Sequence, residues 1–101
     1  MENPTMSGIW KGEVRGFRYG VDVEQVGDHV VGLLHVGGFE RTGSITGVCQ
    51  YPVVSLAGFF VKHGAHFRGR FVDHNTITGT LRYQEDTAEF TFRRAVDGKW
   101  R

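Results

Sequence analysis

The chain has few of the residues that stabilise small secreted proteins. Cys49 is its only cysteine, so no disulfide can form within the 101 residues. This usage favours a reducing compartment and predicts a cytoplasmic protein. The first six residues carry neither a basic region nor an apolar run, which argues against a signal peptide. No apolar stretch is long enough to cross a bilayer, so we expect no membrane partner.

Helix signals and a strong net charge are missing too. Fifteen glycines interrupt nearly every window in which an apolar period of 3.6 residues could develop. The net charge of +1 gives no overall attraction to nucleic acid or to anionic membranes. Length and an apolar fraction of 40% predict a single domain over residues 1–101, with flexible ends at 1–6 and 97–101.

What the sequence does have is a series of short runs rich in β-branched and aromatic residues, separated by turn signals about every ten residues. The predicted strands cover residues 8–16, 18–26, 29–36, 41–50, 53–62, 65–73, 76–84 and 87–95. Every connection is too short for a parallel crossover, so neighbouring strands must pair antiparallel. Closure of such a meander removes its two unpaired edges, so we predict an all-β, eight-stranded up-and-down barrel.

Alternation of apolar and polar residues predicts a dry inward face and a wet outward face in the first, sixth, seventh and eighth strands. Six strands also contain a large apolar residue followed two positions later by glycine. These inward glycines are Gly12, Gly32, Gly47, Gly58, Gly69 and Gly79. Glycine on the inward face suits the tight curvature of a small barrel. We also expect these glycines to leave interior volume that side chains do not fill.

The outward phase of the third to fifth strands is apolar where a polar face is expected. Its large members include Val31, Leu33, Val48, Phe59 and Val61. Soluble monomers rarely expose such a patch, so the pattern predicts a homodimer packed sheet on sheet through these residues. The alternative is a one-residue slip or a bulge, which would exchange the two faces.

Gly8-Ile9-Trp10 opens the first predicted strand, and Arg94 lies near the end of the last. The Gly-x-Trp pattern resembles the short signature that opens calycin barrels, the group of lipocalin, fatty-acid-binding and avidin-like proteins. The resemblance implies that a basic residue of the last strand lies across this tryptophan and closes the barrel floor. Arg94 shares its phase with Phe90 and Phe92, and cation–π contact would compensate part of its burial. The resemblance also implies small-molecule binding inside the barrel or at its mouth.

Residues that could carry chemistry do not form a recognisable set. Of the five histidines, His63 and His66 straddle a predicted hairpin, but no cysteine or carboxylate falls at a ligand spacing. Cys49 lies in the inward phase, with no histidine placed to activate it. The acidic residues alternate outward or occupy turns, so no buried general acid is indicated. We therefore predict no catalytic residue, no metal and no cofactor.

Arginines line the outward phase of the last three strands, at positions 68, 70, 82 and 93. Such a face is a candidate for anions or nucleic acid. The aromatic residues of these strands all fall in the inward phase, so no base-stacking platform accompanies the charge. The prediction is a solvated barrel wall without a nucleic-acid partner.

The favoured function is therefore non-enzymatic binding of a small, mostly apolar molecule. The predicted ligand-binding residues are Trp10, Tyr19, Phe60, Phe67, Phe71, Tyr83, Phe90 and Arg94. Val14, Val21 and Leu81 complete the predicted lining. One alternative is a protein-interaction module that uses the apolar outer face of the third to fifth strands. Another is a small barrel cyclase or isomerase that works by confining its substrate.

Overall fold

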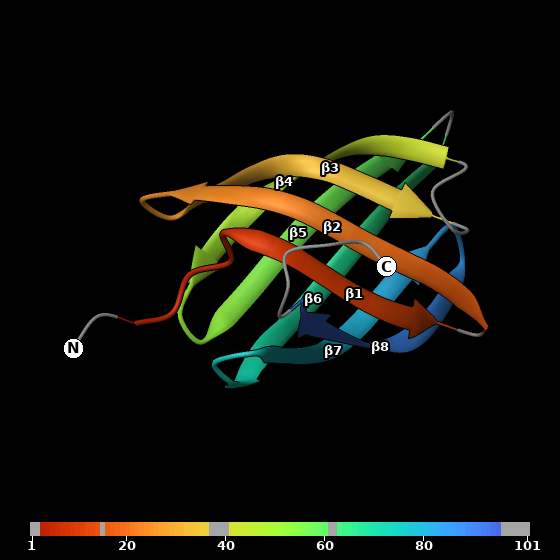
Figure 1. Ribbon diagram of the computed structural model, residues 1–101. Coiled ribbons are helices and arrows are strands. Elements are labelled where there is room, and N and C mark those ends of the chain that lie inside the picture. Colours follow the sequence, from red (N-terminus) through yellow and green to blue (C-terminus); the bar gives the residue numbers. More distant parts are fainter. Residues whose placement is uncertain (1–2, 15, 37–40, 61–62, 96–101) are drawn as a thin grey trace.

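The computed structural model describes residues 3–14, 16–36, 41–60 and 63–95, and they form a closed antiparallel barrel (Figure 1). The strands are β1 (Gly8–Val14), β2 (Phe17–Val26), β3 (His29–Val36), β4 (Arg41–Gln50), β5 (Val53–Phe60), β6 (His63–Asp73), β7 (Thr76–Tyr83) and β8 (Asp86–Arg94). Each strand pairs with its neighbours in sequence, and β1 pairs with β8 to close the barrel. The predicted fold class is confirmed.

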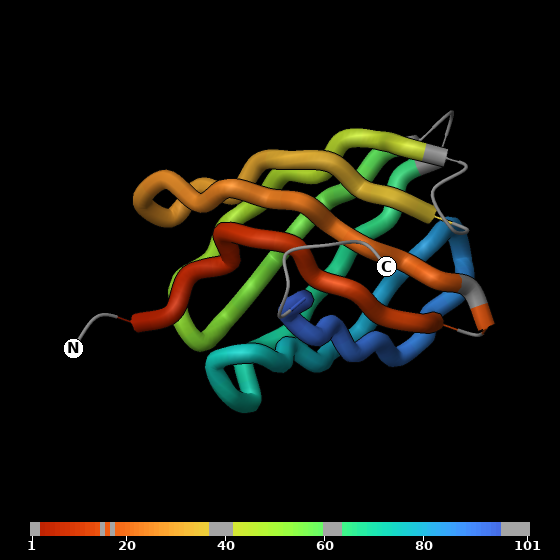
Figure 2. Tube along the Cα trace, in the orientation of Figure 1, coloured from red at the N-terminus to blue at the C-terminus, as the bar shows by residue number. Residues whose placement is uncertain are grey.

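The chain runs up and down, so successive turns alternate between the two ends of the barrel (Figure 2). Closure aligns Trp10 of β1 with Arg94 of β8 and Lys11 with Arg93. The described strands begin and end within two residues of those predicted. A bulge between Phe71 and Asp73 was not predicted; it lies at Val72, whose side chain is exposed. None of the described residues belongs to a helix that could span a membrane.

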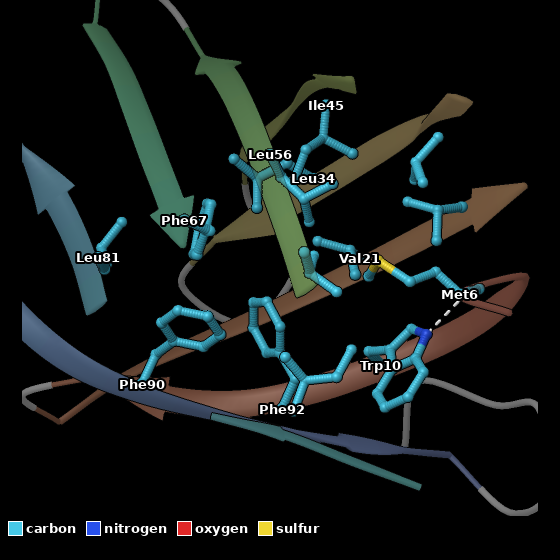
Figure 3. Close-up of a cluster of buried hydrophobic side chains, with 14 of the residues drawn as sticks. Met6, Trp10, Val21, Leu34, Ile45, Leu56, Phe67, Leu81, Phe90 and Phe92 are labelled. Carbon is cyan, nitrogen blue, oxygen red and sulfur yellow. Dashed lines mark hydrogen bonds between the residues drawn. The ribbon is translucent and has the colours of Figure 1, made fainter. Parts of the chain in front are cut away.

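The core lies in the barrel interior and takes side chains from all eight strands (Figure 3). Phe67, Phe90 and Phe92 form a central aromatic cluster with ring centroids 4.9–5.4 Å apart. Val14, Val21 and Leu81, which we predicted to face inward, are buried as well. The alternation in the sequence therefore placed the dry face correctly.

The glycines do not leave interior volume, and that prediction was wrong. A Cβ added to Gly12, Gly32, Gly47, Gly69 or Gly79 would overlap a carbonyl oxygen of the adjacent strand. At Gly58 the added atom would meet Cδ2 of Leu34, 2.8 Å away. Glycine is required here because the backbones of curved neighbouring strands approach closely, so the missing side chains leave no space inside.

Candidate ligand-binding site

One end of the barrel is closed by residues from the beginning and the end of the described chain. Trp10 is fully buried, and its indole Nε1 donates a 2.8 Å hydrogen bond to the carbonyl oxygen of Met6 (Figure 3). The guanidinium carbon of Arg94 lies 4.3 Å from the centroid of the Trp10 ring. Phe71 meets the same ring edge-on at 5.8 Å. We call Met6, Trp10 and Arg94 the floor.

Arg94 is held by three backbone carbonyls in addition to the indole. Its Nη1 donates to the carbonyl of Ser7 at 2.8 Å, and its Nη2 donates to those of Thr5 and His74 at 2.8 and 3.2 Å. Burial lowers the pKa of the Arg94 guanidinium from its usual value, but arginine stays charged at neutral pH. The expected contact with Trp10 is present, and the engaged donors favour a structural role for Arg94.

The segment before β1 contributes to the floor, although no sequence pattern indicated this role. Met6 is fully buried, and its backbone N–H donates to Oε1 of Gln25 at 2.8 Å. The Oγ of Ser7 in turn accepts from the backbone N–H of Gln25 at 2.9 Å. A single methionine among polar residues has no periodicity, so pattern reasoning assigned residues 1–6 to a flexible end. Residues 97–101, the other predicted flexible end, lie outside the described residues.

The predicted ligand-binding residues are distributed along the whole barrel. Trp10, Phe71 and Arg94 lie at the floor, whereas Phe67 and Phe90 lie in the central cluster, where both are buried. Tyr19 and Tyr83 lie at the opposite end, beside the β1–β2 and β7–β8 turns. Phe60 ends β5, and its side chain is not among those described. The structure thus groups the two tyrosines and separates them from the floor.

Tyr19 and Tyr83 mark the end of the barrel that we call the mouth. Both are half-buried and pack against the core, and the Tyr19 ring lies edge-on to Phe67 at 6.5 Å. Burial raises the pKa of the Tyr19 phenol above its usual value, and the nearby Tyr83 phenol raises it further. The Tyr19 hydroxyl is therefore neutral near pH 7, and it forms no hydrogen bond with a described residue. Tyr19 combines an apolar ring with a hydroxyl donor that no described residue engages.

Cys49 and the histidines form no reactive cluster in the described part of the chain. Cys49 is buried, and desolvation, with a smaller contribution from Asp28, raises the pKa of its thiol. A raised thiol pKa disfavours the thiolate that acts as a nucleophile. Within residues 3–14, 16–36, 41–60 and 63–95, no three histidine, cysteine or acidic side chains gather as a metal site would require.

The outward face of β3, β4 and β5 is the apolar surface that the sequence indicated. Val31, Leu33, Val48 and Phe59 are 52%, 47%, 39% and 58% exposed, while Val30, Leu34, Cys49 and Leu56 on the inward face of the same strands are buried. The faces are therefore not exchanged by a slip in register. We call these four residues, with the serines and threonines between them, the outer wall. Val61, the fifth residue predicted for it, lies outside the described residues.

The arginines of β6, β7 and β8 point outward as expected. Arg68, Arg70, Arg82 and Arg93 are all exposed. The phenylalanines Phe67, Phe71, Phe90 and Phe92 of β6 and β8 are buried on the inward face. These phenylalanines therefore do not lie beside the arginines, where a ring could stack on a nucleic-acid base.

Comparison with known proteins supports the architecture. No family model matches the sequence, and no curated protein matches it either. Among solved structures, the barrel is similar to a redesigned β-barrel, mFAP1, whose structure was determined bound to DFHBI. The TM-score is 0.64 at 10% sequence identity, covering 88% of this chain and 94% of that one. The similarity shows a shared barrel fold.

Proposed function

We propose that this barrel binds a small, mostly apolar molecule at its mouth. The observation that carries the proposal is Tyr19, whose half-buried ring rests on Phe67 and whose neutral hydroxyl has no described partner. Small-molecule sites combine apolar walls with a few polar groups that fix the orientation of the ligand. The mouth offers this combination. At the floor, by contrast, the indole N–H of Trp10 and the guanidinium of Arg94 already donate to backbone carbonyls.

The ligand would lie against the mouth tyrosines, with the central cluster as its base. Phe67 and Phe90 would supply apolar surface beneath Tyr19 and Tyr83. Trp10, Phe71 and Arg94 would contribute by holding the far end of the barrel closed. The structure of mFAP1 bound to DFHBI supports the idea that a barrel of this fold can hold a ligand.

Two finer predictions belong to the same proposal. Kinship with calycin barrels is supported by the cation–π contact between Arg94 and Trp10. A cytoplasmic location is supported by the single, buried cysteine.

A titration with an uncharged, environment-sensitive dye such as Nile red tests the ligand proposal. We expect saturable binding to the native protein, and Tyr19→Ala or Tyr83→Ala should weaken it at least about tenfold because each removes apolar contact area at the mouth. Tyr51→Ala is the matched control, since Tyr51 is also partly exposed but packs on Phe71 near the floor. Dye fluorescence measures the dissociation constants. Absence of binding, or an equal loss in the Tyr51 variant, would refute a site at the mouth.

The exposed outer wall supports a second candidate function, protein interaction through a homodimer. Four large apolar side chains on one sheet face exceed what a soluble monomer usually leaves bare. A second copy is the simplest partner, because a twofold dimer uses the same surface on both subunits.

Phe59→Glu should convert the dimer into a folded monomer. A carboxylate at this position would be desolvated and unpaired in the interface, while the barrel core would remain intact. Sedimentation equilibrium measures the change in mass, and Thr80→Glu places the same charge on the exposed face of β7 as a control. A wild-type protein that stays monomeric at high concentration would refute the dimer.

A further inference from the structure

The two mouth tyrosines supply the polar atoms of an otherwise apolar rim. Tyr19 of β2 aligns with Val36 of β3, and Tyr83 of β7 aligns with Ala65 of β6. Val36 and Ala65 are buried, and Ala88 of β8 is half-buried against the core. Among the buried and half-buried inward side chains described at this end, the two phenol hydroxyls are therefore the only groups that can form a hydrogen bond.

The hydroxyl of Tyr19 is the donor that a ligand at the mouth can use. The Tyr19 ring packs edge-on against Phe67 at 6.5 Å, and no residue in the described part of the chain accepts a hydrogen bond from its hydroxyl. A hydroxyl that is taken out of water loses free energy unless another atom replaces the lost hydrogen bond. A ligand that covers Tyr19 should therefore carry an acceptor atom at the place where this hydroxyl lies.

The charges at the mouth favour a neutral acceptor over a carboxylate. Asp86 begins β8, aligns with Tyr83 and is exposed at this end of the barrel. Arg94, the one cation among the described inward side chains, lies at the floor, where backbone carbonyls already engage it. An anionic ligand at the mouth would thus meet the Asp86 carboxylate with no described inward cation to offset the repulsion. A neutral carbonyl oxygen offers two lone pairs and needs no opposite charge.

We propose that the ligand of the mouth is an apolar molecule with a neutral carbonyl group, a ketone or an amide, whose oxygen accepts a hydrogen bond from Tyr19. The inference rests on the proposed ligand-binding function and adds the chemical class of the ligand. Tyr19 orients the carbonyl, while the apolar remainder of the molecule lies against Val36, Ala65 and Ala88. A hydrocarbon of the same size would leave the hydroxyl without a partner and would bind more weakly.

Two uncharged probes test this class with Tyr19→Phe, which keeps the ring and removes only the hydroxyl. Nile red carries a ring carbonyl, whereas diphenylhexatriene is a hydrocarbon without an acceptor. Tyr19→Phe should weaken the binding of Nile red about fivefold, since one neutral hydrogen bond is lost, and should leave the binding of diphenylhexatriene unchanged. The emission of bound Nile red should also move to shorter wavelength. Tyr51→Phe, which removes a hydroxyl beside Phe71 near the floor, is the matched control and should change neither probe.

The possible outcomes separate the class of ligand from the site itself. If neither probe binds the wild type, both proposals fail. If Tyr19→Ala weakens Nile red binding but Tyr19→Phe does not, the site at the mouth stands and the hydrogen bond is refuted. An equal loss of both probes in Tyr19→Phe would indicate altered packing and would refute it too.

A second comparison tests the charge of the ligand. Parinaric acid, a fluorescent fatty acid, and its uncharged methyl ester have the same apolar chain. The ester should bind more tightly, because the acid brings a second negative charge to the end of the barrel that carries Asp86. Tighter binding of the acid would overturn the neutral class. Circular dichroism and urea midpoints like those of the wild type establish that the variants are folded.

Discussion

Gly79→Ala is expected to lower the free energy of unfolding by more than about 3 kcal/mol, beyond the usual cost of overpacking a core. A Cβ on Gly79 would overlap the carbonyl oxygen of Arg68 and the Cα of Gly69 on β6. Relief of this overlap requires β6 and β7 to separate, which breaks their ladder of hydrogen bonds. Urea denaturation followed by tryptophan fluorescence measures the loss, since Trp10 is buried in the native state.

Gly58→Ala is the matched control for this prediction. Gly58 also points inward, but its added methyl would first meet Cδ2 of Leu34 at 2.8 Å and no backbone atom closer than 3.7 Å. A side-chain tip can rotate away, so the expected loss is about 1 kcal/mol. Equal losses at Gly79 and Gly58 would contradict the explanation by close backbone approach.

Arg94→Ala should destabilise the barrel by about 3 kcal/mol, because one side chain supplies both charged hydrogen bonds and a cation–π contact. Its guanidinium bonds to the carbonyls of Thr5, Ser7 and His74, and it covers Trp10. Removal of this group would detach the segment before β1 from the β6–β7 turn and expose the indole. Thermal or urea unfolding gives the stability, and a red shift of the native tryptophan emission would report exposure of Trp10.

Arg93→Ala provides the comparison one residue away. Arg93 is exposed on the outward face, so its removal should cost less than about 0.5 kcal/mol. Arg94→Lys adds a second test, because lysine keeps the charge but cannot reproduce the planar fork that reaches several carbonyls. If Arg93→Ala and Arg94→Ala lose the same stability, the floor contacts described above do not hold the barrel closed.

The outer face of the barrel was predictable because it depends on local alternation. The period of two in β1, β6, β7 and β8 assigned the arginines to solvent and the phenylalanines to the core. The same rule, applied to β3 to β5, predicted that Val31, Leu33 and Phe59 point outward, and all three are exposed. The partner for this wall is not encoded in any pattern within one chain, so the dimer stays a prediction.

The candidate site was predictable only in part. Alternation in the sequence tells to which face of the sheet a side chain points, but not how far along the barrel it lies. The sequence placed the ligand-binding aromatics on the inward face, but it could not tell the central Phe67 from Tyr19 at the mouth. Whether an inward glycine leaves space depends on how closely the adjacent strand approaches, which is a property of the coiled sheet. At Gly69 and Gly79 the backbone itself occupies that space.

The sequence by itself determined the number of strands, their limits and the faces that they bury, since turn residues and alternation act over a few positions. The resemblance to calycin barrels also anticipated the contact of Arg94 with Trp10. Only the tertiary structure decided that Met6 completes the floor, that the interior glycines mark close backbone contacts, and that Tyr19 and Tyr83 meet at one end. The grouping of Tyr19 of β2 with Tyr83 of β7 depends on closure of β1 against β8, whereas the glycine contacts depend on how tightly neighbouring strands coil around each other. Neither property belongs to a local pattern in the sequence.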